Sequence, residues 1–456
     1  MQSRFDSAMR AIVDAAGATE ARPLRIAVAY SAGLDSSVLL HLCAHSRQVV
    51  PALALHVHHG LSTHADSWVE HGRAQAAELV IPFEVAHIEL GRINAEGLEA
   101  AARKQRYAAL GEMCARHQID ILLTAHHQDD QAETLLLQLL RGAGVAGLCG
   151  MQSCHRAPGL LGSSVLLLAR PLLDLTRAEL VQYAGQHQIR HVEDESNADM
   201  RYTRNALRHQ IMPLLAQHFP GFQARFARTA QHAQSALQLL EQLAQQDYAR
   251  CLCVGPVANL DVLQLQSLSG ERIDNVLRYW IAAHQVQMPS SARLAEMRKQ
   301  LLHARDDARV CVKHGNVEVH RYRQQLSIAA CVQSIPAVQS FHWQGEASLN
   351  FPAYGGVLHV LPAAEGQTGL NRDWLLAQSL ELRPRQGGER MKLAANRPNR
   401  DMKSHYQSHG IPYWQRERLP FVFAGGELIF AAGIGLNGSV LVADPERVTL
   451  SWQADE

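Results

Sequence analysis

The stretch that says most about chemistry is SAGLDSS at residues 31–37, which follows an apolar run and opens a helical pattern. Backbone N–H groups in such a turn approach anions, and the helix dipole favours negative charge there. We expect Gly33 to supply the backbone freedom that the turn needs, and the serine hydroxyls to add donors. The lysine of G-x-x-x-x-G-K-[ST] and the glycines of G-x-G-x-x-G are absent. The alternative is a plain helix cap by Asp35 or Ser36. The predicted phosphate-binding residues are Ser31, Ala32, Gly33, Leu34, Asp35 and Ser36.

A second group, HHQDDQAET at residues 126–134, lies where another apolar run ends and another helical pattern begins. Asp129, Asp130 and Glu133 are spaced to form a carboxylate face on the first helical turn. Beside a phosphate loop, these carboxylates would hold Mg²⁺ or the ammonium group of an amine substrate. Two alternatives stay open. Asp130 and Glu133 fit a capping box, or His126 and His127 bind a metal with a third ligand from elsewhere.

Arginines are grouped at two places in the same half of the chain. Arg103 and Arg106 share a helical face with Glu99, which is also the pattern of a solvated ion pair. Further on, Arg201, Arg204 and Arg208 share a face and would form a platform for phosphates, next to Asn205. The alternative there is a charged, exposed helix.

Residues 381–420 are locally basic and carry interleaved aromatic side chains. This composition fits a surface for the RNA backbone with stacking platforms. The alternative is a small domain whose long cationic side chains lie on its own surface. The residues that we expect to contact RNA are Arg383, Arg385, Arg390, Trp414 and Arg416.

The elements that must position these residues alternate between strand and helix. Nearly continuous apolar runs at 25–30, 49–57, 83–90, 119–125 and 165–170 predict buried parallel strands. Helical patterns lie between them near 35–46, 64–79, 95–117 and 129–140. The alternation predicts a doubly wound α/β domain, whose ligands bind beyond the carboxyl ends of the strands. The loops after Tyr30 and Ala125 are therefore the expected site.

The rest of the chain predicts two further domains. Residues 203–305 have helical patterns, followed by a hairpin at 309–328, and a polar stretch at 332–380 is broken by proline and glycine. We expect a catalytic α/β domain at 1–217, a mainly helical domain at 218–335 and a small mixed α/β domain at 345–456.

Composition narrows the class of protein. The 456 residues are 47% hydrophobic, and the formal net charge is zero, so no global field indicates a nucleic-acid partner. The eight cysteines include no C-x-x-C pair, which favours reduced thiols in a cytosolic protein. The first residues lack the apolar core of a signal peptide, and no run is long enough to span a membrane. The oligomeric state is open, and a homodimer is compatible with the fold class.

The loop SAGLDSS resembles the S-G-G-x-D-S signature of the PP-loop ATPases, which cleave ATP to AMP and pyrophosphate. Further stretches resemble the tRNA(Ile)-lysidine synthetase family over essentially the whole chain. They are LHVHHGLSTHADSW (55–68), EAAARKQRY (99–107), TAHHQDDQAETLLLQLLRGAGVAGLCGM (124–151), ARPLL (169–173), EDESNADMRYTRNALRHQIMPLL (193–215) and a C-terminal block at 383–435. The block at 193–215 and the C-terminal block are specific to this family, whereas residues 220–350 match only in helical character.

The resemblance implies a two-step reaction. ATP adenylates the C2 carbonyl oxygen of the wobble cytidine in the CAU-anticodon isoleucine tRNA, and free lysine then displaces AMP. The product reads AUA instead of AUG.

The resemblance also implies roles for the residues above. It places Asp35 with ATP and Mg²⁺, and Asp130 and Glu133 with the lysine ammonium group or Mg²⁺. His126 would contact phosphate or base, and the expected proton acceptor is Asp130, Glu133 or solvent. The remaining residues expected to bind tRNA or the adenylate are His127, Asp129, Arg103, Arg106, Arg201, Arg204, Asn205 and Arg208.

This chain departs from the family at Ala32 and Ala125, where glycine is usual. The extra methyl of Ala32 is tolerable if that residue has a negative φ. The rivals are a thiolating PP-loop enzyme, for which Cys149 and Cys154 are badly spaced, and a non-catalytic ATP-binding or RNA-binding protein.

Overall fold

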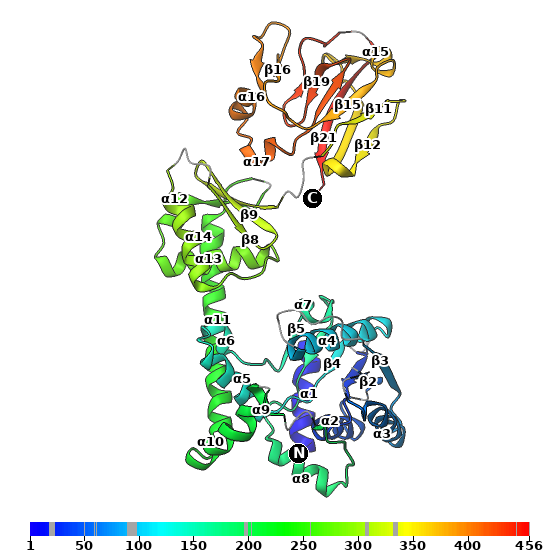
Figure 1. Ribbon diagram of the computed structural model, residues 1–456, viewed down its shortest axis with the longest axis vertical. Helices are drawn as coiled ribbons and strands as arrows, with labels where there is room; N and C mark the ends of the chain where they lie inside the picture. The colour runs from blue at the N-terminus through cyan, green and yellow to red at the C-terminus, as the bar shows by residue number, and fades with distance from the viewer. Residues whose placement is uncertain are drawn as a thin grey trace. The chain divides into compact units, whose positions relative to one another are not determined.

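The computed structural model describes residues 1–17, 23–49, 51–58, 60, 62–88, 98–195, 199–201, 203–255, 257–305, 310–331, 336–443 and 445–455, with the backbone alone at 98–100. The side chain of Glu99 lies outside the described part. So do residues 196–198 and 202 of the block at 193–215, which we call the arginine-rich block. The chain divides into two compact units, Met1–Leu243 and Ala244–Glu456, which are described separately (Figure 1).

Unit 1 is built on a six-stranded sheet with the order β3-β2-β1-β4-β6-β5. All neighbouring strands are parallel except β5, which pairs antiparallel with β6 at the edge. The five predicted strands are confirmed. The sixth was not predicted because its three residues, CHR, form no apolar run. The strands are β1 (Ile26–Ala29), β2 (Leu53–His58), β3 (Phe83–His87), β4 (Ile121–Leu123), β5 (Cys154–Arg156) and β6 (Leu167–Ala169).

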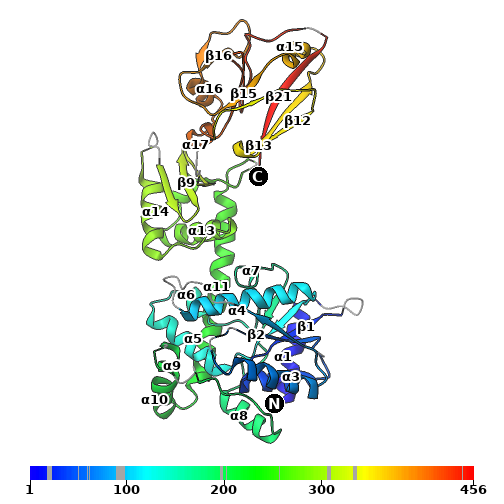
Figure 2. The ribbon, with the colours of Figure 1, turned by 45° about the vertical axis from the view of Figure 1, so that its right-hand side comes forward.

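Helices cover both faces of this sheet, as the two views show (Figures 1 and 2). Alternate strand residues point to opposite faces, so Ile26 and Val28 of β1 pack in one core and Ala27 packs in the other. The first core includes side chains from α1 (Gln2–Ala15), α2 (Leu34–Ala44), α3 (Ala65–Glu78) and α8 (Arg177–Gln186). The second includes side chains from α4 (Leu98–Arg116) and α7 (Pro158–Leu161). The doubly wound α/β prediction is confirmed.

The strand order places the expected site at a reversal of chain direction across the sheet. β1 lies between β2 and β4, so the loop into α2 and the loop into α5 (Gln128–Leu140) leave the carboxyl ends of neighbouring strands. Such a switch point opens a crevice at the carboxyl ends of the strands. The two sequence stretches singled out for chemistry therefore meet there.

The helical region that follows contains one irregular turn. α9 (Thr203–Ala206) continues into a π-helical segment, Leu207–Ile211, and then into α10 (Met212–His218) and the long α11 (Phe222–Cys251). Pro213 comes two residues after the π-helical segment and has no N–H to donate to the preceding turn, which fits the irregular helix there. π-helical turns are rare and often lie at functional sites.

The first part of unit 2 packs helices against a small antiparallel sheet. α12 (Val262–Gln266), α13 (Gly270–Ala283) and α14 (Ser291–His303) share a core with the sheet β7-β10-β9-β8. The predicted hairpin at 309–328 is confirmed as β8 and β9, with β8 at one edge of this larger sheet and β10 paired to the other side of β9. Its strands are β7 (Leu260–Asp261), β8 (Val310–His314), β9 (Val317–Tyr322) and β10 (Gln325–Ala330).

The last part of unit 2 has two antiparallel sheets, β11-β15-β18-β19-β20 and β12-β13-β21-β14, around one core. β11 (Gln339–Phe341) pairs with β15 (Leu380–Arg383), and β13 (Gly356–Pro362) pairs with β21 (Arg447–Ala454). Residues 339–380 thus share a core with the C-terminal strands. The division into three domains stays a prediction. The other elements are β12 (Ser348–Phe351), β14 (Leu370–Asn371), α15 (Arg372–Leu376), β16 (Arg390–Met391), β17 (Arg400–Asp401), α16 (Met402–Ser408), α17 (Tyr413–Arg416), β18 (Phe421–Ala424), β19 (Glu427–Ala431) and β20 (Gly435–Leu436).

Among the described residues, the helices are too short or too polar to cross a membrane.

Candidate active site

The backbone of the phosphate loop differs from the expectation at two residues. Gly33 is the N-cap of α2 with φ −74° and ψ 166°, a conformation open to any residue. The residue in the left-handed region is Ala32, with φ 63°. The expectation that Gly33 supplies the backbone freedom is therefore wrong, and the negative φ that would make a methyl at Ala32 tolerable is not present. Two hydrogen bonds to the carbonyl oxygen of this buried alanine fix its strained backbone conformation. The donors are Val192 N at 2.9 Å and Ser37 Oγ at 3.3 Å.

The serines of the loop are hydrogen-bonded within the loop. The Oγ atoms of Ser31 and Ser36 are 3.1 Å apart, Ser31 N donates to Ser36 Oγ, and Ser36 Oγ donates to Gly33 O at 3.0 Å. Ser31 is exposed, whereas Ser36 and Ser37 are buried. The hydroxyl of Ser31 is thus the one that faces outward for an anion at the start of α2.

The second loop forms a helix cap, but with a different residue from the one expected. His127 is the N-cap of α5, its Nδ1 accepts from Asp130 N at 3.4 Å, and its own N–H donates to Asp130 Oδ2 at 3.0 Å. The capping box joins His127 and Asp130, not Asp130 and Glu133. The carboxylate of Glu133 is free from capping, and it lies one turn further along, almost fully buried.

Two arginines from the α9 region hold these carboxylates. Arg204 donates to Glu133 Oε2 at 2.8 Å and to Asp130 Oδ1 at 2.9 Å. Arg208 donates to both oxygens of Glu133, at 2.7 and 3.0 Å, and to Asp130 Oδ1 at 3.1 Å. Arg208 belongs to the π-helical segment, so the wider turn directs both guanidinium groups to the same pair of acids. We call these four residues the acid–arginine cluster.

Burial and charge set the protonation states in this loop. Burial alone would raise the pKa of Asp130, but His127, Arg204, His126 and the backbone N–H of His127 lower it to about 2. Burial, aided by Arg170, Arg103 and Arg204 and opposed by Asp130, lowers the pKa of His126 to about 3. For His127, burial acts downward, yet the nearby carboxylates outweigh it and raise the pKa. At neutral pH, Asp130 is therefore ionised and His126 is neutral.

The phosphate loop and the acidic loop meet through His127. Its Nε2 is 3.6 Å from Asp35 Oδ2 and 3.4 Å from Asp130 Oδ2, without a hydrogen bond to either. Oδ1 of Asp35 is also buried and has no hydrogen-bond partner among the described residues. An unpaired carboxylate oxygen beside a second carboxylate is the donor set that Mg²⁺ prefers, so Asp35 fits a magnesium ligand. Asp130 fits less well, because both of its oxygens already accept hydrogen bonds.

Other predicted residues are spread around this centre. Asp129 accepts from Arg177 N at 2.8 Å and from Gln223 Nε2 at 3.2 Å, which ties α5 to α8 and α11. Arg103 and Arg106 are exposed beside the ring of Tyr107.

Two further members of the arginine-rich block bond to Asp199. Arg201 is exposed, and its guanidinium group pairs with the Asp199 carboxylate at 2.7 Å. The side-chain amide of Asn205 donates to the backbone carbonyl of Asp199 at 3.0 Å. Arg201 does not join Arg204 and Arg208 on the acids.

In unit 2, the predicted RNA contacts differ in exposure. Trp414 is stacked on His320 with ring centroids 4.1 Å apart, and Arg416 donates to Ile411 O at 2.7 Å; each is 5% exposed. Neither offers a free surface to a base or a phosphate in this structure. Arg383 and Arg385 are half-buried, whereas Arg390 is exposed at the start of the β16–β17 hairpin.

The sequence interpretation missed Arg170, which lies directly after β6. It is 5% exposed, donates to Gln152 O at 2.8 Å, and keeps its Nε without a partner among the described residues. The sequence signal for it was an arginine at the end of the strand-like run VLLLAR. This strand, β6, pairs with β4, and His126 lies in the loop that follows β4.

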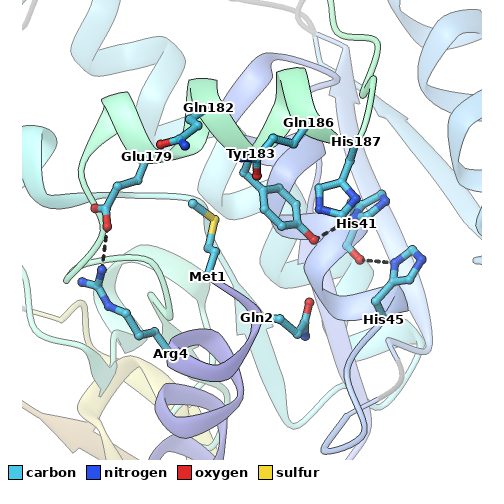
Figure 3. A pocket seen from close by; sticks show the side chains of 10 residues that line it. All are labelled: Met1, Gln2, Arg4, His41, His45, Glu179, Gln182, Tyr183, Gln186 and His187. Atoms are coloured by element: carbon cyan, nitrogen blue, oxygen red, sulfur yellow. Dashed lines mark hydrogen bonds and ion pairs between the residues drawn. The ribbon is translucent and has the colours of Figure 1, made fainter.

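A cavity of about 510 Å³ lies at the other end of α2 (Figure 3). His41, His45 and His187 surround it with Tyr183, and burial together with the two neighbouring histidines lowers the pKa of His41 to about 4. None of the residues predicted to bind nucleotide or substrate lines it, so we do not assign it to the reaction.

Comparisons with known proteins agree with this geometry. A family model described as "PP-loop domain" matches residues 1–215, which makes the first unit an ATP-binding domain of the PP-loop class. Models described as "TilS substrate binding domain" and "TilS substrate C-terminal domain" match residues 260–327 and 380–452.

The chain is 40% identical to the tRNA(Ile)-lysidine synthase of Burkholderia pseudomallei, with 94% of each chain covered. It is 41% identical to that of Ralstonia nicotianae, with 91% of this chain and 90% of the relative covered. The chain therefore belongs to the tRNA(Ile)-lysidine synthase family, and the resemblance seen in the sequence is confirmed.

Proposed function

We propose that this protein joins free L-lysine to C2 of the wobble cytidine in the CAU-anticodon isoleucine tRNA. ATP first adenylates the C2 carbonyl oxygen and releases pyrophosphate. The ε-amino group of lysine then attacks C2, a C–N bond forms, and the C–O bond to AMP breaks while the amine loses a proton. The product reads AUA in place of AUG.

One observation carries this proposal beyond family membership. The phosphate loop and the acid–arginine cluster lie at one switch point, with His127 within 3.6 Å of both Asp35 and Asp130. An adenylating enzyme that uses an amine nucleophile needs an anion site and a carboxylate site side by side. Adjacent carboxyl ends of β1 and β4 supply that arrangement.

The loop residues would stabilise charge on the phosphates. Backbone N–H groups at the start of α2 and the exposed hydroxyl of Ser31 act as donors where charge develops. Asp35, and more weakly Asp130, would hold Mg²⁺, which neutralises charge on the phosphates when it is bound. Burial, aided by the charges of Arg170, Arg103 and Arg204, lowers the pKa of His126 and keeps this imidazole neutral, so it contacts base or phosphate as a neutral partner.

The acid–arginine cluster would bind the lysine amine through its carboxylates. Asp130 and Glu133 carry two negative charges, and Arg204 and Arg208 carry two positive charges. A lysine ammonium group therefore meets carboxylates that are already neutralised, and it gains contact by sharing or displacing an arginine. This exchange would release a guanidinium group toward the AMP phosphate or the tRNA backbone.

The pKa values weigh against two groups as the proton acceptor. A general base works best with a pKa near the working pH. The pKa of Asp130 is about 2 and that of His126 about 3, so both are too weakly basic. Of the three candidates named from the sequence, Glu133 and solvent are left.

We propose that RNA contacts in unit 2 come from exposed cations on and after the β16–β17 hairpin. Arg390, Arg397, Arg400 and Lys403 are exposed there. The buried Trp414 and Arg416 are not part of the proposed surface, because Trp414 packs on His320 and Arg416 donates to Ile411 O.

Pyrophosphate release tests the reaction class. We expect ATP-dependent release that requires the CAU-anticodon transcript, together with AMP formation that requires lysine. Release without tRNA, or entry of labelled sulfur rather than lysine into the transcript, would overturn the proposal.

A further inference from the structure

Three side chains with metal-binding atoms meet on one face of the small sheet in unit 2. Cys311 on β8 lies directly opposite His320 on β9, and Glu318 lies two residues before His320 on the same face. The sulfur, one carboxylate oxygen and one ring nitrogen lie within 4.8 Å of one another. Ligand atoms around a tetrahedral zinc ion are about 3.5 Å apart, so small side-chain shifts would close this set on an ion.

The ring of His320 is held in one orientation. It is 1% exposed, and Trp414 of α17 stacks on it in nearly parallel planes. Its Nδ1 is 3.1 Å from Tyr413 Oη, and that hydroxyl donates to Val310 O at 3.5 Å. When the hydroxyl hydrogen is on Val310 O, the tyrosine oxygen accepts from Nδ1–H and Nε2 is unprotonated, which is the tautomer that a metal bound at Nε2 requires.

In that tautomer, Nε2 of His320 is a buried acceptor aimed at another acceptor. It lies 3.2 Å from Glu318 Oε2 but has no hydrogen-bond partner among the residues that the structure describes. Lys313 pairs with the other oxygen, Oε1, at 3.2 Å, so Oε2 stays available. Two facing lone pairs at this distance repel each other unless a cation lies between them.

We propose that Cys311, Glu318 and His320 bind a zinc ion, with a water molecule at the fourth position. Cys331 is too far along the sheet to join them. Its N–H donates to Asn316 O, which places it four residues, or about 13 Å, along β9 from His320. All eight cysteines of the chain are free thiols in the structure, so no disulfide competes for Cys311.

The ligand types select zinc. Thiolate and imidazole ligands with one carboxylate suit Zn²⁺ in tetrahedral geometry, whereas Mg²⁺ and Ca²⁺ prefer oxygen alone. A histidine whose second nitrogen is fixed by a hydroxyl is typical of such sites. The ion would fasten β8 to β9 beneath Tyr413 and Trp414. This inference is independent of the proposed reaction.

Cobalt binding to the metal-free full-length protein, kept reduced, provides the test. We expect one equivalent of Co²⁺ to give a thiolate-to-cobalt charge-transfer band and tetrahedral visible bands, both removed by added Zn²⁺. Cys311→Ser should lose the charge-transfer band, whereas Cys331→Ser, which removes a thiol outside the site, should keep it. Tyr413→Phe should keep the band but weaken binding by about 10- to 100-fold, because it removes the hydrogen bond that orients His320.

The matched control is Cys253→Ser, another cysteine of unit 2 that lies outside this cluster. It should bind cobalt as the unaltered protein does. Since Cys311 is exposed, its serine variant should fold normally. No charge-transfer band in the unaltered protein, or an unchanged band in Cys311→Ser, would overturn the proposal.

Discussion

Replacing Glu133 by glutamine should strongly destabilise the first unit. The Glu133 side chain is 2% exposed and accepts three hydrogen bonds from Arg204 and Arg208, whose side chains are only about a quarter exposed. Glutamine offers one acceptor and turns its NH₂ group toward a guanidinium donor. Removing one partner of a buried ion pair costs about 3 to 5 kcal/mol, because the remaining charge is left uncompensated. For a unit of this size, that lowers the unfolding midpoint by roughly 6 to 20 °C.

Calorimetry of the full-length protein provides the assay. The transition of the first unit can be identified because ATP, which binds its folded state, shifts it upward. The control is Glu70→Gln, which carries the same substitution in the same unit at an exposed pair with Arg73, 3.8 Å apart. This control should leave the midpoint unchanged. A Glu133→Gln midpoint equal to that of Glu70→Gln would refute the assignment of a buried cluster.

Three further changes have defined outcomes. Asp35→Ala should abolish ATP turnover with tRNA affinity nearly intact, since Asp35 belongs to the phosphate loop; equal loss of both activities in turnover and filter-binding assays would contradict its role. Ala32→Gly should stabilise the first unit to urea by about 0.5 to 1 kcal/mol, because glycine adopts φ 63° without strain; a net loss would contradict this. The pKa of His126 is about 3 in the folded state and about 6.5 in the unfolded state. The free energy of unfolding should therefore fall as the pH drops below 6.5, by about 2 kcal/mol at pH 5, because the unfolded state takes up the proton first. His126→Asn should flatten this part of the stability profile, and an unchanged profile would show that the group is not buried neutral.

The alternating pattern of apolar strands and helices predicted the first unit well. Buried parallel strands are continuous apolar runs, so β1, β2, β3, β4 and β6 were visible in the sequence. The carboxyl ends of β1 and β4 could be paired in advance because the fold rule puts ligands at switch points. The edge strand β5 is polar and short, and no local signal marks it.

The details of the site could not be read from local sequence. That Arg204 and Arg208 neutralise Asp130 and Glu133 depends on a π-helical turn and on contacts more than 70 residues apart. The identity of the capping residue, His127, depends on where α5 begins. Burial of Trp414 against β9 likewise depends on tertiary packing, which an interleaved basic and aromatic composition does not encode.

Incorporation of radiolabelled lysine into an unmodified CAU-anticodon isoleucine tRNA transcript, with and without ATP, tests the central claim most directly. We predict ATP-dependent labelling that disappears when the wobble cytidine is replaced. ATP consumption in the presence of this tRNA without any lysine label would contradict the claim and assign the adenylating site to another nucleophile.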